Sequence, residues 1–146
     1  MAKYMLIMRN SGTFDDFRDM DFEQVMNAMG AYNESMMKAG VLLGGDGLTD
    51  AAQGAVVEFT ADAPVVSDGP YGETHELFNG FWTIHAATQE EAVEWAKRAP
   101  LGPGDKIEVR RLTDDSDFAD YQDNEYVKKE KVWRDELDAR QAADAS

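Results

Sequence analysis

The sequence contains no cysteine. This absence excludes disulfide bonds, thiolate metal sites and a cysteine nucleophile. Basic residues are also scarce: 14 Lys and Arg stand against 29 Asp and Glu, which gives a net charge of −15 at pH 7. Binding to nucleic acid needs clustered Lys and Arg, and no such cluster occurs here. We therefore expect neither nucleic acid nor an anionic membrane surface as a partner.

Long hydrophobic runs are missing as well. The apolar run at residues 4–8 is too short for a signal peptide or a membrane span, so a cytoplasmic location is expected. No nucleophile elbow, zincin helix or dinucleotide fingerprint is present. Residues 44–47 read Gly-Gly-Asp-Gly, but the Gly-Lys-Ser/Thr of a phosphate loop does not follow. We expect no cofactor, and interpret residues 44–47 as a turn whose glycines approach a neighbouring strand or a ligand.

Two helices are predicted by their capping residues. The first begins at Asp21, a good N-cap, with Gln24 as the partner in a capping box. It ends before Gly40, which is typical of a helix C-terminus. The second begins after Thr88, with Glu91 in the partner position. Apolar residues at helical spacing give each helix one face for packing.

Strands fill the rest of residues 1–112. The order of strands and helices is typical of an α+β fold with a ferredoxin-like, split βαβ antiparallel sheet and two helices on one face. The other face would carry side chains such as Met5, Phe59 and Phe81, or the residues that alternate with them along the strands, and an exposed apolar patch of that size usually marks an interface. We expect a homodimer in which two sheets pack face to face. The predicted strands are residues 3–9, 54–60, 64–67, 81–86 and 106–112.

The composition changes at residue 113. Residues 113–146 are rich in acidic side chains and poor in large apolar ones, and residues 125–139 have the composition of a helix. Its narrow apolar stripe consists of Tyr126, Trp133 and Leu137, so this helix needs a surface to lie on. Either it docks on its own domain or it clasps a second subunit. We expect an α+β domain at 1–112 and an acidic extension at 113–146.

The most unusual stretch reads Asp-Gly-Pro-Tyr at residues 68–71. An Asp that opens a turn usually accepts a hydrogen bond from the N–H two residues on. That position is Pro70, which has no N–H. Asp68 therefore either caps a later N–H or keeps its carboxylate free. Pro70 also disfavours a helical conformation at Gly69, so a stiff corner is predicted, either as a plain strand connection or as a site.

Acid–base groups follow this corner. His75 lies between Glu73 and Glu76, and carboxylates that approach it would raise its pKa. Asp68, with Glu73 or His75, is thus a candidate catalytic pair. These groups also suit a divalent cation, but their spacing matches no standard motif and no metal site is expected. His85, on a predicted strand, is expected to be a half-exposed surface residue.

Several short motifs follow one another along residues 3–112. In chain order they are Lys-Tyr-Met-Leu at 3–6, Lys-Ala-Gly-Val-Leu at 38–42, Gly-Asp-Gly-Leu at 45–48, Asp-Gly-Pro-Tyr at 68–71, Glu-Thr at 73–74, Gly-Phe-Trp at 80–82 and the helix of residues 90–100. Together they resemble the YCII-related proteins, in particular the DGPF-domain branch. Tyr71 replaces the signature phenylalanine, His75 a usual lysine and Asn79 a usual glycine. The resemblance implies a dimeric α+β barrel.

The resemblance implies less about function. YCII relatives have been proposed to use a His-Asp pair in a cleft, but the first half of this chain has no histidine, so that pair is not carried over. Some DGPF-type proteins are associated with extracytoplasmic-function sigma factors. Because this chain has no basic helix for DNA, such a role would act through protein contact.

Three functions stay open. The first is a small-molecule-binding module with a pocket between the sheet and the Asp-Gly-Pro loop. The second is an acid–base enzyme acting on a small metabolite. The third is a structural or protein-partner module, including a link to sigma-factor regulation. The residues expected to bind a ligand are Asp46, Asp68, Gly69, Pro70, Tyr71, Phe81 and Trp82.

Overall fold

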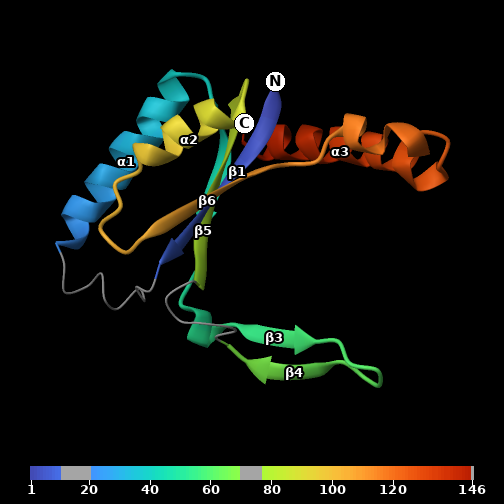
Figure 1. Ribbon diagram of the computed structural model, residues 1–146, viewed down its shortest axis with the longest axis horizontal. Coiled ribbons are helices and arrows are strands. Elements are labelled where there is room, and N and C mark those ends of the chain that lie inside the picture. Colours follow the sequence, from blue (N-terminus) through green and yellow to red (C-terminus); the bar gives the residue numbers. More distant parts are fainter. Residues whose placement is uncertain (11–20, 70–76, 146) are drawn as a thin grey trace. The chain divides into compact units, whose positions relative to one another are not determined.

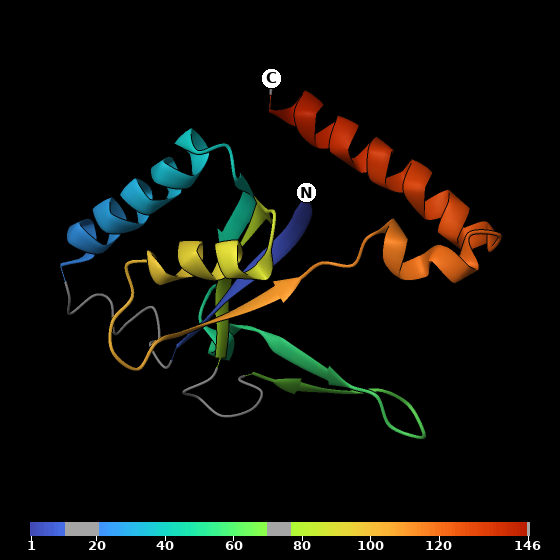
Figure 2. The same cartoon turned by 45° about the horizontal axis from the view of Figure 1, so that its top comes forward.

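The computed structural model describes residues 1–10, 21–69 and 77–145. They belong to two compact units, Met1–Leu112 and Thr113–Ser146. The first unit has the α+β organisation expected from the sequence, with antiparallel sheets and helices in alternation (Figures 1 and 2). The second unit is helical.

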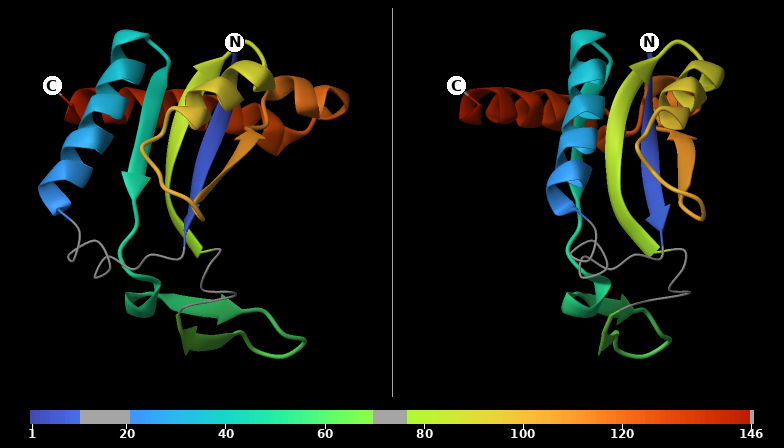
Figure 3. Two further views of the ribbon diagram at one scale, coloured as in Figure 1. Left: turned by 60° about the vertical axis from the view of Figure 1, so that its left-hand side comes forward. Right: turned by 90° about the vertical axis from the view of Figure 1, so that its left-hand side faces the viewer.

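Four strands form the main sheet of the first unit, in the order β2-β5-β1-β6. They are β1 (Ala2–Asn10), β2 (Leu42–Gly47), β5 (Leu77–Ala86) and β6 (Lys106–Arg111). Every neighbouring pair is antiparallel. β1 and β2 are therefore parallel with β5 between them (Figure 3), and β5 and β6 are parallel with β1 between them. This connectivity is that of two interleaved split βαβ units.

The helices that make these connections are α1 (Phe22–Lys38) and α2 (Gln89–Lys97). Their N-caps are the predicted ones: the Asp21 side chain accepts a hydrogen bond from the Gln24 N–H at 3.3 Å, and Thr88 Oγ1 accepts one from the Glu91 N–H at 3.2 Å. The Glu91 carboxylate accepts from the N–H of Ala87 at 2.9 Å, one residue before the expected donor. Both starts are thus fixed by local hydrogen bonds.

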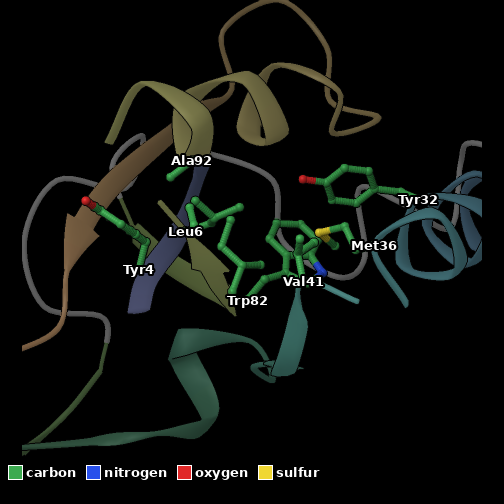
Figure 4. Packing of buried hydrophobic residues seen from close by; sticks show 9 residues of the cluster. Tyr4, Leu6, Tyr32, Met36, Val41, Trp82 and Ala92 are labelled. Atoms are coloured by element: carbon green, nitrogen blue, oxygen red, sulfur yellow. The ribbon is translucent and has the colours of Figure 1, made fainter. Parts of the chain in front are cut away.

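Both helices cover the same face of the sheet, and the hydrophobic core lies between the helices and that face (Figure 4). Leu6, Met36 and Ile84 are fully buried there. Side chains alternate along a strand, so alternate residues of β1 and β5 face the helices. Tyr4, Leu6, Trp82, Ile84 and Ala86 are buried in this way.

Tyr32 joins the two helices. Its hydroxyl donates a hydrogen bond to the carbonyl oxygen of Trp95 at 2.8 Å, and its ring meets the Trp82 ring edge-on with centroids 5.4 Å apart. Burial raises the pKa of Tyr32 to about 12, although the nearby Arg98 cation opposes the shift. The phenol therefore stays protonated in the folded state at pH values where an unfolded tyrosine, with a pKa of about 10, has ionised.

This difference predicts a loss of stability at high pH. The stabilisation from Tyr32 is complete below pH 10 and is lost as the pH rises towards about 12, because the unfolded state releases its proton first. Tyr32→Phe lacks this component. It should be less stable than the wild type by about 1 kcal/mol at pH 8, and the gap should narrow at pH 11. Urea unfolding at both pH values measures it; a constant gap would contradict the assignment.

Two further strands form a sheet of their own. β3 (Ala55–Glu58) pairs with β4 (Val65–Asp68) in an antiparallel hairpin. Both strands were predicted, but the expectation that Phe59 lies on the face of the main sheet is wrong. Phe59 follows the end of β3 and is 83% exposed. Alternation of apolar residues predicted the strand, but it carries no information about which sheet the strand joins.

The prediction of a turn at residues 44–47 is also wrong, because these residues lie in strand β2. The expected close approach of the backbone is nevertheless present. A Cβ atom on Gly45 would lie 2.6 Å from the carbonyl oxygen of Phe81 in the neighbouring strand. Glycine is needed at this position for the packing of β2 against β5, and its presence does not mark a turn.

In the second unit, a short 3₁₀ segment, η3 (Asp115–Tyr121), precedes α3 (Glu125–Asp144). Asn124 caps α3 by accepting hydrogen bonds from two N–H groups of its first turn. Ion pairs between residues four apart, Glu125–Lys129 at 2.6 Å and Glu130–Arg134 at 2.7 Å, support the helix on its surface. None of the described helices is long and apolar enough to span a membrane.

Candidate functional site

A pocket of about 450 Å³ lies on the helix-covered side of the main sheet, between α1 and strands β2 and β5. Two residues of its wall, Met29 and Asn33, belong to α1, and the others belong to the sheet. The residues that line it are Met8, Met29, Asn33, Leu42, Gly44, Gly45, Asp46, Gly47, Gly80, Phe81 and Trp82.

Glycines form the sheet side of this pocket. Gly45 pairs with Trp82, and Gly47 pairs with Gly80; directly opposed residues of an antiparallel pair share a face. These three glycines therefore lie on the helix-facing side, where Trp82 also lies. A Cβ on Gly47 would meet no atom within 4 Å, and one on Gly80 would lie 3.3 Å from Met8 Cε. The space at Gly47 therefore belongs to the hollow under α1, whereas Gly45 and Gly80 allow close contacts between the paired strands.

A polar pair, buried Trp82 and partly buried Asn33, forms one wall. The Trp82 indole Nε1 donates a hydrogen bond to Asn33 Oδ1 at 2.8 Å, and Trp82 is only 8% exposed. An indole N–H donates and cannot accept, so the amide of Asn33 must turn its oxygen towards the ring. Its nitrogen, which carries two N–H donors, is turned away from the indole. This wall is thus fixed in both position and hydrogen-bonding polarity.

The structure brings together only part of the predicted site. Asp46, Phe81 and Trp82 line the pocket, whereas Asp68 ends β4 and is exposed, and neither it nor Gly69 is among the described lining residues. Other predicted residues lie outside the described part of the chain. They are Pro70, Tyr71, Glu73 and His75.

Asn33 was missed, although the sequence held a signal for it. It lies four residues after Met29 and three before Met36, so it shares their helix face. A lone amide on an otherwise apolar face must find a partner, because an unpaired polar group is costly to bury. Here the partner is the Trp82 indole.

The glycine of the Asp-Gly-Pro motif has a structural task. Its N–H donates to the carbonyl oxygen of Gly54 at 3.0 Å, and a Cβ at this position would overlap the carbonyl oxygen of Ala51. Among the described residues, positive φ angles occur only at Gly40 and Gly104. Gly69 is therefore required by a close backbone approach and not by a left-handed torsion angle.

His85 is partly exposed, as expected, and its backbone N–H donates to the carbonyl oxygen of Val41 at 2.8 Å. Its Nδ1 atom is buried and has no hydrogen-bond partner within the described chain. In residues 1–10, 21–69 and 77–145, no three acidic or histidine side chains are grouped so as to hold a metal ion.

A second hollow of about 520 Å³ lies between α2, the loop after it and β6. Its charged groups already have local partners: Lys97 Nζ lies 2.6 Å from the Glu94 carboxylate, and the Asp105 carboxylate accepts from the Gly102 N–H at 2.9 Å. The hydrogen bond and the positive charge of Lys97 lower the pKa of Glu94. The pocket under α1 is the stronger candidate, because it contains an oriented polar pair.

Two comparisons connect these features to known proteins. A 75-residue stretch is 32% identical to an uncharacterised protein of Rhizobium meliloti (strain 1021). This stretch covers 51% of the present chain and 60% of the relative, so the match spans less than two thirds of the relative's length. The YCII-related domain matches residues 2–116, which include every strand of both sheets and the helices α1 and α2. The chain therefore belongs to the YCII-related domain family.

Proposed function

We propose that the protein binds a small molecule in the pocket between α1 and strands β2 and β5. The observation that supports this function is the cavity itself: Gly47 leaves open space there, and the hydrogen-bonded Trp82–Asn33 pair forms its wall. Its volume of about 450 Å³ falls in the range of small-molecule sites. Apolar lining with a few placed polar groups is the usual composition of such sites.

We also propose that the chain falls in the DGPF branch of its family, on the strength of the Asp-Gly-Pro sequence at residues 68–70. The proposed ligand site lies under α1, whereas the sequence led us to expect it at the Asp-Gly-Pro motif. Asp68 and Gly69 belong to the hairpin segment, whereas Asp46, Phe81 and Trp82 belong to the pocket.

Gly47→Leu should abolish ligand binding while the protein stays folded. The new side chain enters the open space of the pocket, since nothing lies within 4 Å of its Cβ position. A metabolite library is screened by thermal shift on the wild type. A ligand present at about 100 times its Kd stabilises a protein by about 2.7 kcal/mol, and the variant should lose this stabilisation.

Gly44→Leu is the matched control. Gly44 borders the pocket with its backbone alone, and it also has no atom within 4 Å of its Cβ position. It pairs with Thr83, so a side chain at position 44 would lie on the face opposite to Trp82 and outside the pocket. This variant should keep the ligand-induced shift. If Gly47→Leu retained the shift too, the ligand would bind elsewhere. A library that shifted neither the wild type nor Gly44→Leu would contradict the proposed function.

We further infer a homodimer through the face of the sheet that the helices leave uncovered. Met5, Ile7 and Phe81 share this face by the register of β1 and β5. Met5 and Phe81 are partly exposed, whereas Ile7 is only 6% exposed within one chain, and the Phe78 and Phe81 rings lie 6.1 Å apart. An apolar patch of this kind is typical of an interface. Light scattering at micromolar concentration tests it: the mass of a single chain, 16.3 kDa, would refute the dimer.

A further inference from the structure

The pocket has a hydrogen-bonding polarity that restricts its ligand. Trp82 fixes the oxygen of the Asn33 amide, so the group that Asn33 offers to a ligand is its N–H₂, a donor. Asn33 is partly buried, and the pocket is lined on its other sides by Met8, Met29 and the glycines. A ligand group that meets this amide must therefore be a hydrogen-bond acceptor.

The charges around the pocket restrict the ligand further. No Lys, Arg or His is among the described residues that line it. Asp46 is the charged residue of the lining, but it pairs with Phe81, so its side chain belongs to the face opposite to Trp82. The chain as a whole has a net charge of −15. An anionic acceptor such as a carboxylate would enter a largely apolar space without a counter-charge, and desolvating it would be costly. An uncharged acceptor avoids this cost.

We propose that the pocket selects a neutral carbonyl compound, whose apolar body packs against Trp82 and the methionines and whose oxygen accepts a hydrogen bond from Asn33. This inference rests on the proposed function and adds the ligand class and the residue that determines it. Asn33, on α1, determines this specificity. The indole of Trp82, on β5, orients its amide.

Three probes of similar shape test the proposal: the ketone 1-indanone, its hydrocarbon indane, and the anion indane-1-carboxylate. The readout is the indole Nε1–H signal of Trp82 in a ¹H–¹⁵N NMR spectrum, one of three tryptophan signals, titrated at pH 8. A neutral hydrogen bond is worth a factor of about 3 to 10 in affinity. The wild type should therefore bind 1-indanone about 3- to 10-fold more tightly than indane, and the carboxylate more weakly than the ketone.

Asn33→Asp is the matched variant. Its carboxylate has nearly the same shape and still accepts from the Trp82 indole, but an ionised carboxylate has no N–H to donate. The variant should lose the preference for 1-indanone and bind indane as the wild type does. A thermal melt and the retained Trp82 signal show that the fold is intact.

The outcomes separate the two proposals. Equal affinities for ketone and hydrocarbon in the wild type, or a preference that survives in Asn33→Asp, would overturn the role of Asn33. If Gly47→Leu still removed the binding of both probes, the pocket would stand as a binding site. Tighter binding of the carboxylate than of the ketone would overturn the neutral ligand class. If none of the three probes bound, the neutral ligand class would also be overturned. The library screen would then decide whether the pocket binds any ligand.

Discussion

Trp82→Ala should lower the free energy of unfolding by about 3–5 kcal/mol, as truncation of large buried aromatic residues does. Trp82 is 8% exposed, so little of the lost contact would be replaced by water. The variant removes the edge-on contact with Tyr32 and leaves the Asn33 oxygen without its indole donor. An unpaired polar group adds its own desolvation cost to that of the cavity.

Urea unfolding followed by far-UV circular dichroism measures this effect. Trp133→Ala is the control, because Trp133 lies on α3 and is 50% exposed. It should change the free energy of unfolding by no more than about 0.5 kcal/mol. Equal losses for the two variants would mean that Trp82 does not hold the core and the pocket wall together.

Gly45→Ala should destabilise the protein by about 1–3 kcal/mol, in the range seen when a packed site is overfilled. The added methyl group would lie 2.6 Å from the carbonyl oxygen of Phe81, which is a backbone atom, and 3.1 Å from Trp82 Cδ1. Since a backbone carbonyl in the middle of a paired strand cannot rotate away, β2 would have to move from β5.

Gly47→Ala provides the comparison two residues further along the same face. Its Cβ position has no neighbour within 4 Å, and its φ is not in the left-handed region. The variant should be as stable as the wild type or gain about 0.4–1 kcal/mol from the smaller conformational freedom of its unfolded chain. Thermal unfolding of both variants distinguishes these effects. A similar loss for both would show that the contact with the Phe81 carbonyl does not determine the cost at position 45.

Local rules predicted the parts of the fold that depend on local chemistry. The helix starts at Asp21 and Thr88 follow from hydrogen bonds within a few residues, so the sequence contains all the information needed. The strands other than β2 follow from apolar runs, and the antiparallel α+β organisation follows from the order of the elements.

Long-range packing explains the errors. Glycine content predicted a turn at residues 44–47, but the reason for Gly45 is an atom of Phe81, a residue distant in the sequence. Likewise, only the pairing of β2 with β5 places Gly47 and Gly80 side by side and opens the pocket. The bond between Asn33 and Trp82 spans 49 positions in the chain, so no local pattern could have joined them.

The hollow under α1 is open at position 47 because glycine has no side chain, and this makes its size easy to change. Position 47 lies on the edge strand β2 with free space before it, so Ala, Val or Leu there would shorten the cavity in steps without rebuilding the sheet. Homologous proteins that carry a bulkier residue at this position should accept smaller molecules. In the proposed binding mode, a single codon would be enough to change the size of the accepted ligand while the Asn33 amide still donates to the ligand's oxygen.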